Sequence, residues 1–158
     1  MHREDYDAVV DGHRTAAGQL FGLPIVMDTD REDIAVGDTL LLTYKGQDLA
    51  ILEVEDKWEP DKVVEAKGCY GTTSLEHPAV RMIAMERRRF YLGGALKGLE
   101  LPQRVFPCKT PAEVRAGLPD GEDVVAFQCR NPIHRAHYEL FTRALHAQNV
   151  SENAVVLV

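Results

Sequence analysis

The order of apolar and polar residues predicts a β-rich first part of the chain. Residues 39–44 and 48–56 are apolar-rich runs on either side of a polar turn at 45–47, and in the second run charged residues alternate with apolar ones. This pattern predicts a β-hairpin with one buried face. The apolar run 19–28 predicts a further, largely buried strand. In the run 90–101, the glycines predict two short strands joined by a tight turn.

Helix signals lie between these strands. Residues 5–12 are a weak helix candidate. Glu59-Pro60-Asp61 predicts the start of a short helix, because proline suits the first turn and acids suit the positive end of the helix dipole. Gly68 predicts the end of that helix. His77-Pro78 predicts another helix, which runs toward the arginines 87–89.

The pattern changes near Pro102, and the rest of the chain predicts a βαβ unit. Thr110-Pro111-Ala112-Glu113 has the order of a helix cap, a first-turn proline and an acid. The run 123–128 is apolar without alternation, which is typical of a parallel strand buried on both faces. A helix over 133–148 and a second apolar strand over 154–158 follow.

We therefore predict two domains, residues 1–105 and residues 106–158. The first combines helices with an antiparallel sheet (α+β), and the second opens a parallel α/β sheet. Two parallel strands cannot cover their own faces and edges. We therefore expect the second domain to be incomplete and the chain to be a piece of a longer protein.

Composition and charge exclude several classes of protein. The 158 residues carry a formal net charge of −7, which argues against a nucleic-acid-binding face. No apolar run approaches the roughly 20 residues of a membrane span. Cys69, Cys108 and Cys129 form no CxxC pair, so we expect reduced thiols and an intracellular protein rather than zinc or disulfides. Cys129 is interpreted as a small filler residue.

The densest group of polar residues lies between the strand 123–128 and the helix that follows. It consists of an amide, a guanidinium, a second amide and two imidazoles: Gln128, Arg130, Asn131, His134 and His137. Such a strand-to-helix turn is where α/β proteins hold anionic ligands. We expect Asn131 to be the N-cap and Pro132 the first helical residue, so that the free N–H groups point at a bound phosphate.

These side chains suit a tetrahedral oxyanion. Arg130 offers a planar fork of donors, and Gln128 adds a neutral donor beside it. His134 and His137 lie three residues apart, so both imidazoles can donate to phosphate oxygens, and a protonated one adds charge stabilisation. Zinc is a weak alternative, because only Glu139 is placed to add a third ligand.

At this point the residues resemble a known family. Residues 124–140, VVAFQCRNPIHRAHYEL, are similar to the ATP sulfurylase (sulfate adenylyltransferase) pattern Q-x-R-N-P-x-H-x-x-H at every fixed position. The runs 71–78 (GTTSLEHP) and 109–113 (KTPAE) resemble further segments of that family. The resemblance covers nearly the whole chain.

The resemblance implies a PUA-like β-rich domain followed by the start of a Rossmann-like nucleotidyltransferase domain. It implies a reaction in which ATP and sulfate give adenosine 5′-phosphosulfate and pyrophosphate. Gln128 and Arg130 would bind sulfate, and Asn131, His134 and His137 would contact the ATP phosphates, so that Arg130, Asn131, His134 and His137 are the expected catalytic residues. Mg²⁺ would arrive with ATP, and no cofactor is expected on protein ligands.

The resemblance also has limits. The downstream family segments H-P-x-x-G-x-x-K and G-R-D are not in these 158 residues, so we expect little or no activity from this chain alone. The full-length protein is expected to be a homo-oligomer in the cytoplasm or a plastid, without membrane or nucleic-acid partners. Three alternatives stay open: a non-catalytic PUA-like RNA-binding module, another HxxH-type nucleotidyltransferase, and a bifunctional parent with a kinase domain.

Overall fold

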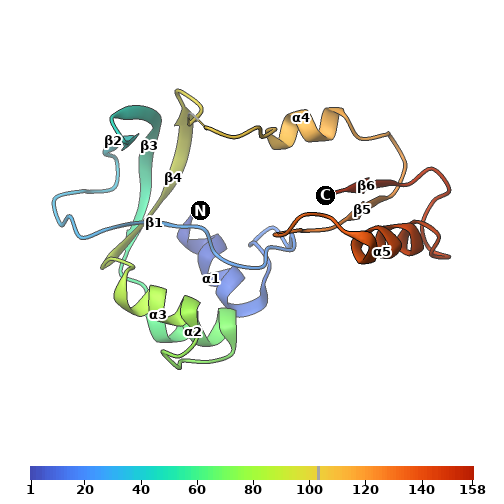
Figure 1. Ribbon diagram of the computed structural model, residues 1–158. Coiled ribbons are helices and arrows are strands. Elements are labelled where there is room, and N and C mark those ends of the chain that lie inside the picture. Colours follow the sequence, from blue (N-terminus) through green and yellow to red (C-terminus); the bar gives the residue numbers. More distant parts are fainter. Residues whose placement is uncertain (103) are drawn as a thin grey trace. The chain divides into compact units, whose positions relative to one another are not determined.

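The computed structural model describes residues 1–102 and 104–158, and the chain divides into two compact units, Met1–Gln103 and Arg104–Val158 (Figure 1). The first unit contains α1 (Arg3–Gly12), β1 (Met27–Thr29), β2 (Thr39–Tyr44), β3 (Gln47–Trp58), α2 (Lys62–Tyr70), α3 (Pro78–Met85) and β4 (Phe90–Gly98). The second contains α4 (Pro111–Ala116), β5 (Val124–Ala126), α5 (Arg135–Leu145) and β6 (Val155–Leu157). The predicted fold class, α+β followed by parallel α/β, is confirmed.

The first unit is built on a four-stranded antiparallel sheet in the order β1-β4-β3-β2. The predicted hairpin is confirmed as β2 and β3. Its turn is the pair Lys45 and Gly46, with φ of 50° and 80°. Two consecutive residues with positive φ are the arrangement that matches the twist of paired strands. β3 continues beyond the predicted end at residue 56 and reaches Trp58.

The glycine-rich run forms one strand, β4, and the prediction of two strands with a turn is wrong. The register between β3 and β4 shifts between Val54 and Asp56, opposite Gly94 and Gly93. Gly94 has φ of 152°, and a Cβ there would lie 1.8 Å from the Glu53 carbonyl oxygen. The glycine therefore allows a bulge and a close backbone approach, which has the same sequence signal as a turn.

The predicted strand 19–28 is also largely wrong. Only Met27–Thr29 joins the sheet as β1, and its ladder begins at the pair Met27 and Leu92. Two of the preceding apolar side chains face solvent, since Leu20 is 76% and Ile25 68% exposed, while Val26 packs against the core. Pro24 has no N–H to donate to a ladder, which is consistent with an irregular segment at this point.

Two clusters of buried side chains form the core of the first unit. One contains Tyr6, Val10, Trp58 and Tyr91, and the other contains Ile34, Leu52, Val54 and Leu92. The Tyr6, Trp58 and Tyr91 rings meet one another with centroids 5.4 to 5.9 Å apart. The first cluster packs α1 against the ends of β3 and β4, with Cys69 of α2 beside it.

A buried carboxylate completes the aromatic cluster. Glu65 of α2 is 5% exposed, and its Oε2 accepts hydrogen bonds from the hydroxyls of Tyr6 and Tyr91 at 2.9 and 3.0 Å. Burial and the Glu65 carboxylate raise the pKa of both tyrosines well above the usual value. The cluster thus holds both phenols protonated over the ordinary pH range.

Helix α2 begins and ends later than the sequence predicts. Asp61 is its N-cap and accepts from the N–H groups of Val63 and Val64, both at 3.0 Å. The helix passes through Gly68, the predicted end, and stops at Gly71 with φ of 68°. A Cβ at position 68 would lie 2.3 Å from the carbonyl oxygen of Val10. Gly68 therefore serves the contact between α1 and α2.

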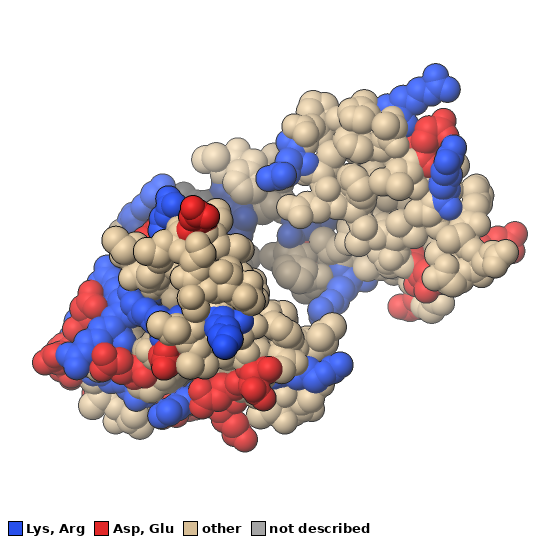
Figure 2. All heavy atoms as spheres, turned by 90° about the horizontal axis from the view of Figure 1, so that it is seen from below, with Lys and Arg blue, Asp and Glu red and all other residues tan. Residues whose placement is uncertain are grey.

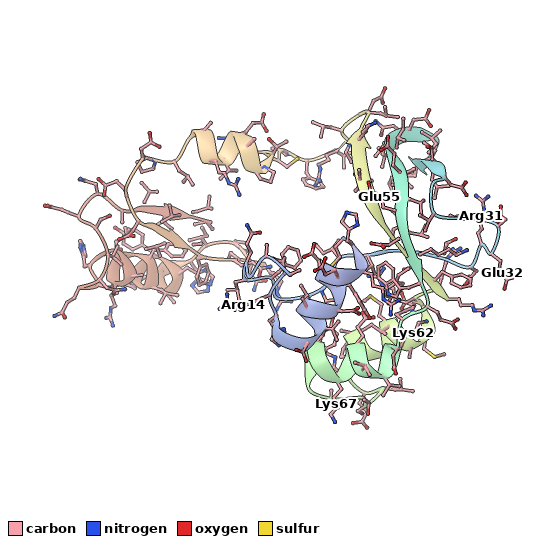
Figure 3. The ribbon with its side chains drawn as sticks, turned by 180° about the vertical axis from the view of Figure 1, so that it is seen from behind. Arg14, Arg31, Glu32, Glu55, Lys62 and Lys67 are labelled. Atoms are coloured by element: carbon pink, nitrogen blue, oxygen red, sulfur yellow. The ribbon has the colours of Figure 1, made fainter. Side chains whose placement is uncertain are left out.

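One lysine binds the backbone of the loop that precedes β2, at residues 31–34. Lys57 Nζ donates to the carbonyl oxygens of Arg31, Glu32 and Ile34 at 3.1, 3.0 and 2.6 Å, and it lies 4.4 Å from the centroid of the Phe90 ring. Figure 3 shows the Arg31 and Glu32 side chains pointing outward from this loop. The backbone of the loop is thus fixed by Lys57, while the Arg31 and Glu32 side chains face solvent and the Ile34 side chain enters the core.

The second unit has a parallel pair of strands, as predicted. Val124, Val125 and Ala126 pair with Val155, Val156 and Leu157, and α5 contacts both strands. The strands and the helix are shorter than predicted. The predicted burial of the first strand on both faces is wrong for this chain, because Val124 and Ala126 are exposed. Within residues 104–158 none of the side chains is fully buried.

The predicted cap of α4 is confirmed. The Thr110 N–H and hydroxyl donate to Glu113 Oε2 at 2.7 and 2.8 Å, and the Glu113 N–H donates back to the Thr110 hydroxyl at 3.3 Å. Over the residues that the structure describes, no helix has the length and apolar content to cross a membrane.

Candidate functional site

The polar run 128–134 forms the turn between β5 and α5. The Phe127 N–H donates to the Leu157 carbonyl at 2.8 Å, so the parallel ladder ends immediately before Gln128. Gln128, Arg130 and Asn131 then follow as exposed residues. The turn therefore joins the C-terminal end of a parallel strand to the N-terminal end of a helix, where the partial positive charge of the helix lies.

The prediction that Asn131 is the N-cap of this helix is wrong. Helix α5 begins at Arg135, and His134 is its N-cap, with extended backbone angles of −128° and 177°. Pro132 lies before the helix instead of in its first turn. A proline disfavours helical angles in the residue that precedes it, which is Asn131 here. The turn is thus longer than expected, and it leaves Asn131 outside the helix.

The two histidines are in direct contact. Their rings stack with centroids 3.9 Å apart and an interplanar angle of 21°. The His134 N–H donates to Nδ1 of His137 at 3.4 Å. His134 is exposed and His137 half-buried, because the Phe127 ring packs against His137 with a centroid distance of 5.5 Å. The pair therefore forms one local unit at the start of α5.

Cys129 belongs to the same group of side chains. The interpretation of Cys129 as a filler residue does not include these contacts. Its Sγ lies 2.8 Å from the Asn131 carbonyl oxygen and 4.0 Å from Nδ1 of His137. Phe127 and Cys129 are thus the two site residues missed by the sequence analysis. The available signal was their spacing, because alternate residues 127 and 129 of an extended segment point to the same side as the helix.

The structure brings Cys129, Asn131, His134 and His137 together. Gln128 and Arg130 lie on either side of Cys129 in the chain, and within the described residues their side chains make no hydrogen bond or ion pair. Their amide and guanidinium donors are therefore free for a ligand. Figure 2 shows a broad uncharged surface on this unit, with Lys, Arg, Asp and Glu side chains along its margin on the face in view.

Metal ligands are not grouped at this turn. Among residues 1–102 and 104–158, no set of three or more His, Cys, Asp or Glu side chains is placed to hold a metal ion. Glu139, the candidate third ligand, instead lies 4.0 Å from the Arg135 guanidinium. The donor set at the turn consists of amide, guanidinium and imidazole groups, which suit an oxyanion better than a cation.

Comparison with known proteins divides the chain between residues 101 and 107, a stretch that includes the boundary between the two compact units. Residues 1–101 match the family described as PUA-like domain, and residues 107–158 match the family described as ATP-sulfurylase. Both matches agree with the resemblance of the sequence motifs.

Curated relatives carry one common description. Sulfate adenylyltransferases of Chaetomium globosum and Neurospora crassa are 39% and 40% identical to this chain, each over 99% of it and 30% of the relative. That of Kluyveromyces lactis is 38% identical over 94% of this chain and 31% of the relative. The chain therefore spans about a third of the length of these relatives.

A solved structure shares the fold. It is described as a hexameric APS kinase from Thiobacillus denitrificans, with a TM-score of 0.65 and 24% identity. The similarity covers 99% of this chain and 28% of that one. At this identity the similarity concerns the fold.

Proposed function

The chain belongs to the ATP sulfurylase family, with a PUA-like N-terminal region, and we propose that its second unit carries the anion-binding turn of a sulfate adenylyltransferase. In the proposed reaction, ATP and sulfate give adenosine 5′-phosphosulfate and pyrophosphate. The observation that carries the proposal is the position of Gln128, Arg130, His134 and His137 at one strand-to-helix turn.

The proposed sulfate subsite consists of Gln128 and Arg130. Both side chains are exposed and without a protein partner in the described part of the chain. A guanidinium can offer two parallel N–H donors to a tetrahedral oxyanion, and the glutamine amide adds a neutral donor. The partial positive charge at the start of α5 favours an anion at the same place.

The proposed phosphate subsite consists of Asn131, His134 and His137. The stacked imidazoles lie at the first turn of α5, and Asn131 precedes them in the turn. Each of these side chains can donate hydrogen bonds to phosphate oxygens. Because Asn131 is outside the helix, its role in the proposal is a side-chain contact and not that of a cap.

The chemistry would depend on alignment and charge neutralisation. A sulfate oxygen forms a bond to the α-phosphorus of ATP, and the bond from that phosphorus to the bridging oxygen of pyrophosphate breaks. The residues of the turn would hold the two anions against their mutual repulsion and stabilise the charge that develops on the phosphates. Mg²⁺ would come to the site bound to the ATP phosphates.

Calorimetric titration of the 158-residue chain with sulfate tests the proposed subsite. Arg130→Ala is expected to weaken sulfate binding by roughly tenfold or more, because a charge-assisted contact to the anion is lost. Arg135→Ala is the matched control: it removes the same charge five residues away, from a side chain that is 93% exposed beside Glu139. An equal loss in both variants would assign sulfate binding to net charge and contradict the subsite.

Catalysis is proposed for the longer protein. We expect the 158-residue chain to show little or no sulfate-dependent ATP–pyrophosphate exchange, and exchange at the rate of a full-length relative would refute this. A homo-oligomer and an intracellular location, in the cytoplasm or a plastid, belong to the same proposal. Light scattering of the longer protein tests the first, and a monomer would contradict it.

A further inference from the structure

In both helices of the second unit, the N–H of the N-cap residue donates to the side chain three residues later. The acceptor is a carboxylate in α4 and an imidazole in α5. In α4 the Thr110 N–H donates to the carboxylate of Glu113, three residues later, at 2.7 Å. In α5 the His134 N–H donates to the imidazole of His137, also three residues later, at 3.4 Å. An acidic or amide side chain is the usual acceptor at this position of a capping box. The imidazole of His137 therefore takes a structural role that glutamate has in α4.

This contact decides where the proton of the His137 ring lies. A backbone N–H can only donate, so Nδ1 of His137 must present its lone pair to it. A neutral imidazole carries one N–H, which is then on Nε2. An imidazolium has protons on both nitrogens and cannot accept this bond. The cap thus selects the neutral ring with a donor at Nε2.

Three neighbours hold the ring in place. The His134 ring stacks on it at 3.9 Å, and Phe127 packs at 5.5 Å. Cys129 Sγ is 4.0 Å from Nδ1 but only 2.8 Å from the Asn131 carbonyl oxygen, so the single thiol proton belongs to the bond with Asn131. The thiol thereby ties the turn 129–131 beside the imidazole and leaves Nδ1 to the His134 N–H.

We propose that His137 acts as a neutral hydrogen-bond donor through Nε2–H, with its tautomer fixed by the His134 backbone and with Cys129 as a positioning residue. The inference rests on the proposed function, and the acceptor is a phosphate oxygen of ATP. His137 then contributes direction to the site, while the positive charge comes from the Arg130 guanidinium and the start of α5.

Nuclear magnetic resonance of the imidazole nitrogens tests the tautomer directly. In the ¹⁵N-labelled 158-residue chain above about pH 8, where free imidazole is neutral, His137 is expected to show a protonated Nε2 and an unprotonated Nδ1. The other five histidines of the chain serve as internal references. A protonated Nδ1, or two averaged nitrogens, would overturn the assignment whether or not ATP binds.

Three variants separate the donor from the cap. His137→Gln keeps both an acceptor for the His134 N–H and a neutral donor, so it should bind Mg²⁺–ATP more tightly than His137→Leu. His137→Leu loses both and should bind roughly ten- to a hundredfold more weakly. His137→Glu retains only the acceptor, and it should keep the helix while losing affinity.

These variants also distinguish the two proposals. An equal loss in His137→Gln and His137→Leu would mean that the imidazole charge matters and would overturn the neutral-donor role. If wild type did not bind Mg²⁺–ATP, the phosphate contact and the proposed function would fail together, while the tautomer would still be decided by its own measurement.

The positioning role of Cys129 has a separate test. Cys129→Ser keeps a hydroxyl donor for the Asn131 carbonyl, whereas Cys129→Ala does not. We expect the His137 nitrogen resonances and the Mg²⁺–ATP affinity to change in the alanine variant and to be restored by serine. Identical behaviour of the two variants would show that the residue only fills space.

Discussion

The two units of the chain are stabilised in different ways. Every fully buried side chain belongs to the first unit, where aromatic and aliphatic clusters join helices to a four-stranded sheet. The second unit, within the described residues, has no fully buried side chain and depends on two helix caps and a short parallel ladder. Local hydrogen bonds define helices and strands in both units. Burial of apolar side chains, which supplies most of the free energy of folding, is concentrated in the first unit.

The difference matters for function because the candidate site lies in the unit with less burial. The turn 128–134 is organised by contacts that span few residues: a thiol to a carbonyl, a backbone N–H to an imidazole, and two stacked rings. Such contacts can be formed without a core. The chemistry of the site is thus encoded locally, while its rigidity depends on what packs around it.

Removing a core aromatic is expected to have the largest effect. Tyr91 is fully buried and packs against Tyr6 and Trp58. Tyr91→Ala should lower the free energy of unfolding of the first unit by about 3–5 kcal/mol, as for other buried aromatics. Urea unfolding followed by the fluorescence of Trp58, the single tryptophan, measures this loss.

The matched variant in the second unit is Phe127→Ala, whose ring packs against His137 and Phe141. It should leave the Trp58 transition unchanged and reduce only the amide protection of α5. A shift of the Trp58 transition as large as that of Tyr91→Ala would contradict the contrast between the units.

Alkaline pH should selectively destabilise the first unit, by less than the loss of Tyr91. The pKa values of Tyr6 and Tyr91 are raised by burial and by Glu65, so the folded state holds these protons more tightly than the unfolded state. Stability is therefore fully present below the unfolded pKa of about 10 and falls as pH rises above it.

The urea midpoint measured from pH 8 to pH 11 should fall most steeply near and above pH 10. Tyr6→Phe combined with Tyr91→Phe should flatten this fall, whereas Tyr44→Phe, at an exposed position, should not. An equal pH dependence in all three proteins would remove the buried phenols as its cause.

The helix caps should give the smallest effect, and one that is similar in the two units. Asp61→Ala in α2 and Thr110→Ala in α4 each remove a side-chain acceptor at a helix N-terminus. Each should cost about 1 kcal/mol in its own helix. Amide exchange of the first turn measures each loss, and a markedly larger loss in α2 would mean that its cap is coupled to the core.

The sequence predicts those elements whose signals are local. The hairpin of β2 and β3 follows from the polar turn predicted at 45–47 and the alternation of the run after it, and the α4 cap follows from Thr110 and Glu113. The parallel pair of β5 and β6 follows from two apolar runs separated by a helix.

Glycine and proline explain most of the errors. Gly68 and Gly94 have the same signal as a helix stop and a turn, but their role is a close approach to the carbonyl oxygens of Val10 and Glu53. That approach depends on residues far along the chain and cannot be recognised from local order. Pro132 is of a residue type that suits the first helical position, but the helix begins three residues later, at Arg135. There the His137 imidazole accepts from the N–H of the N-cap residue His134.

The loop closed by Lys57 shows what a side-chain cation can do in place of a bound ion. Three carbonyl oxygens converge on its Nζ as they would on a monovalent metal. Because this ammonium group belongs to a residue of β3, it cannot dissociate from the protein as a bound metal ion can. The fold thereby holds this loop with a cation of its own chain, and the position of that cation is set by the length of one methylene chain on β3.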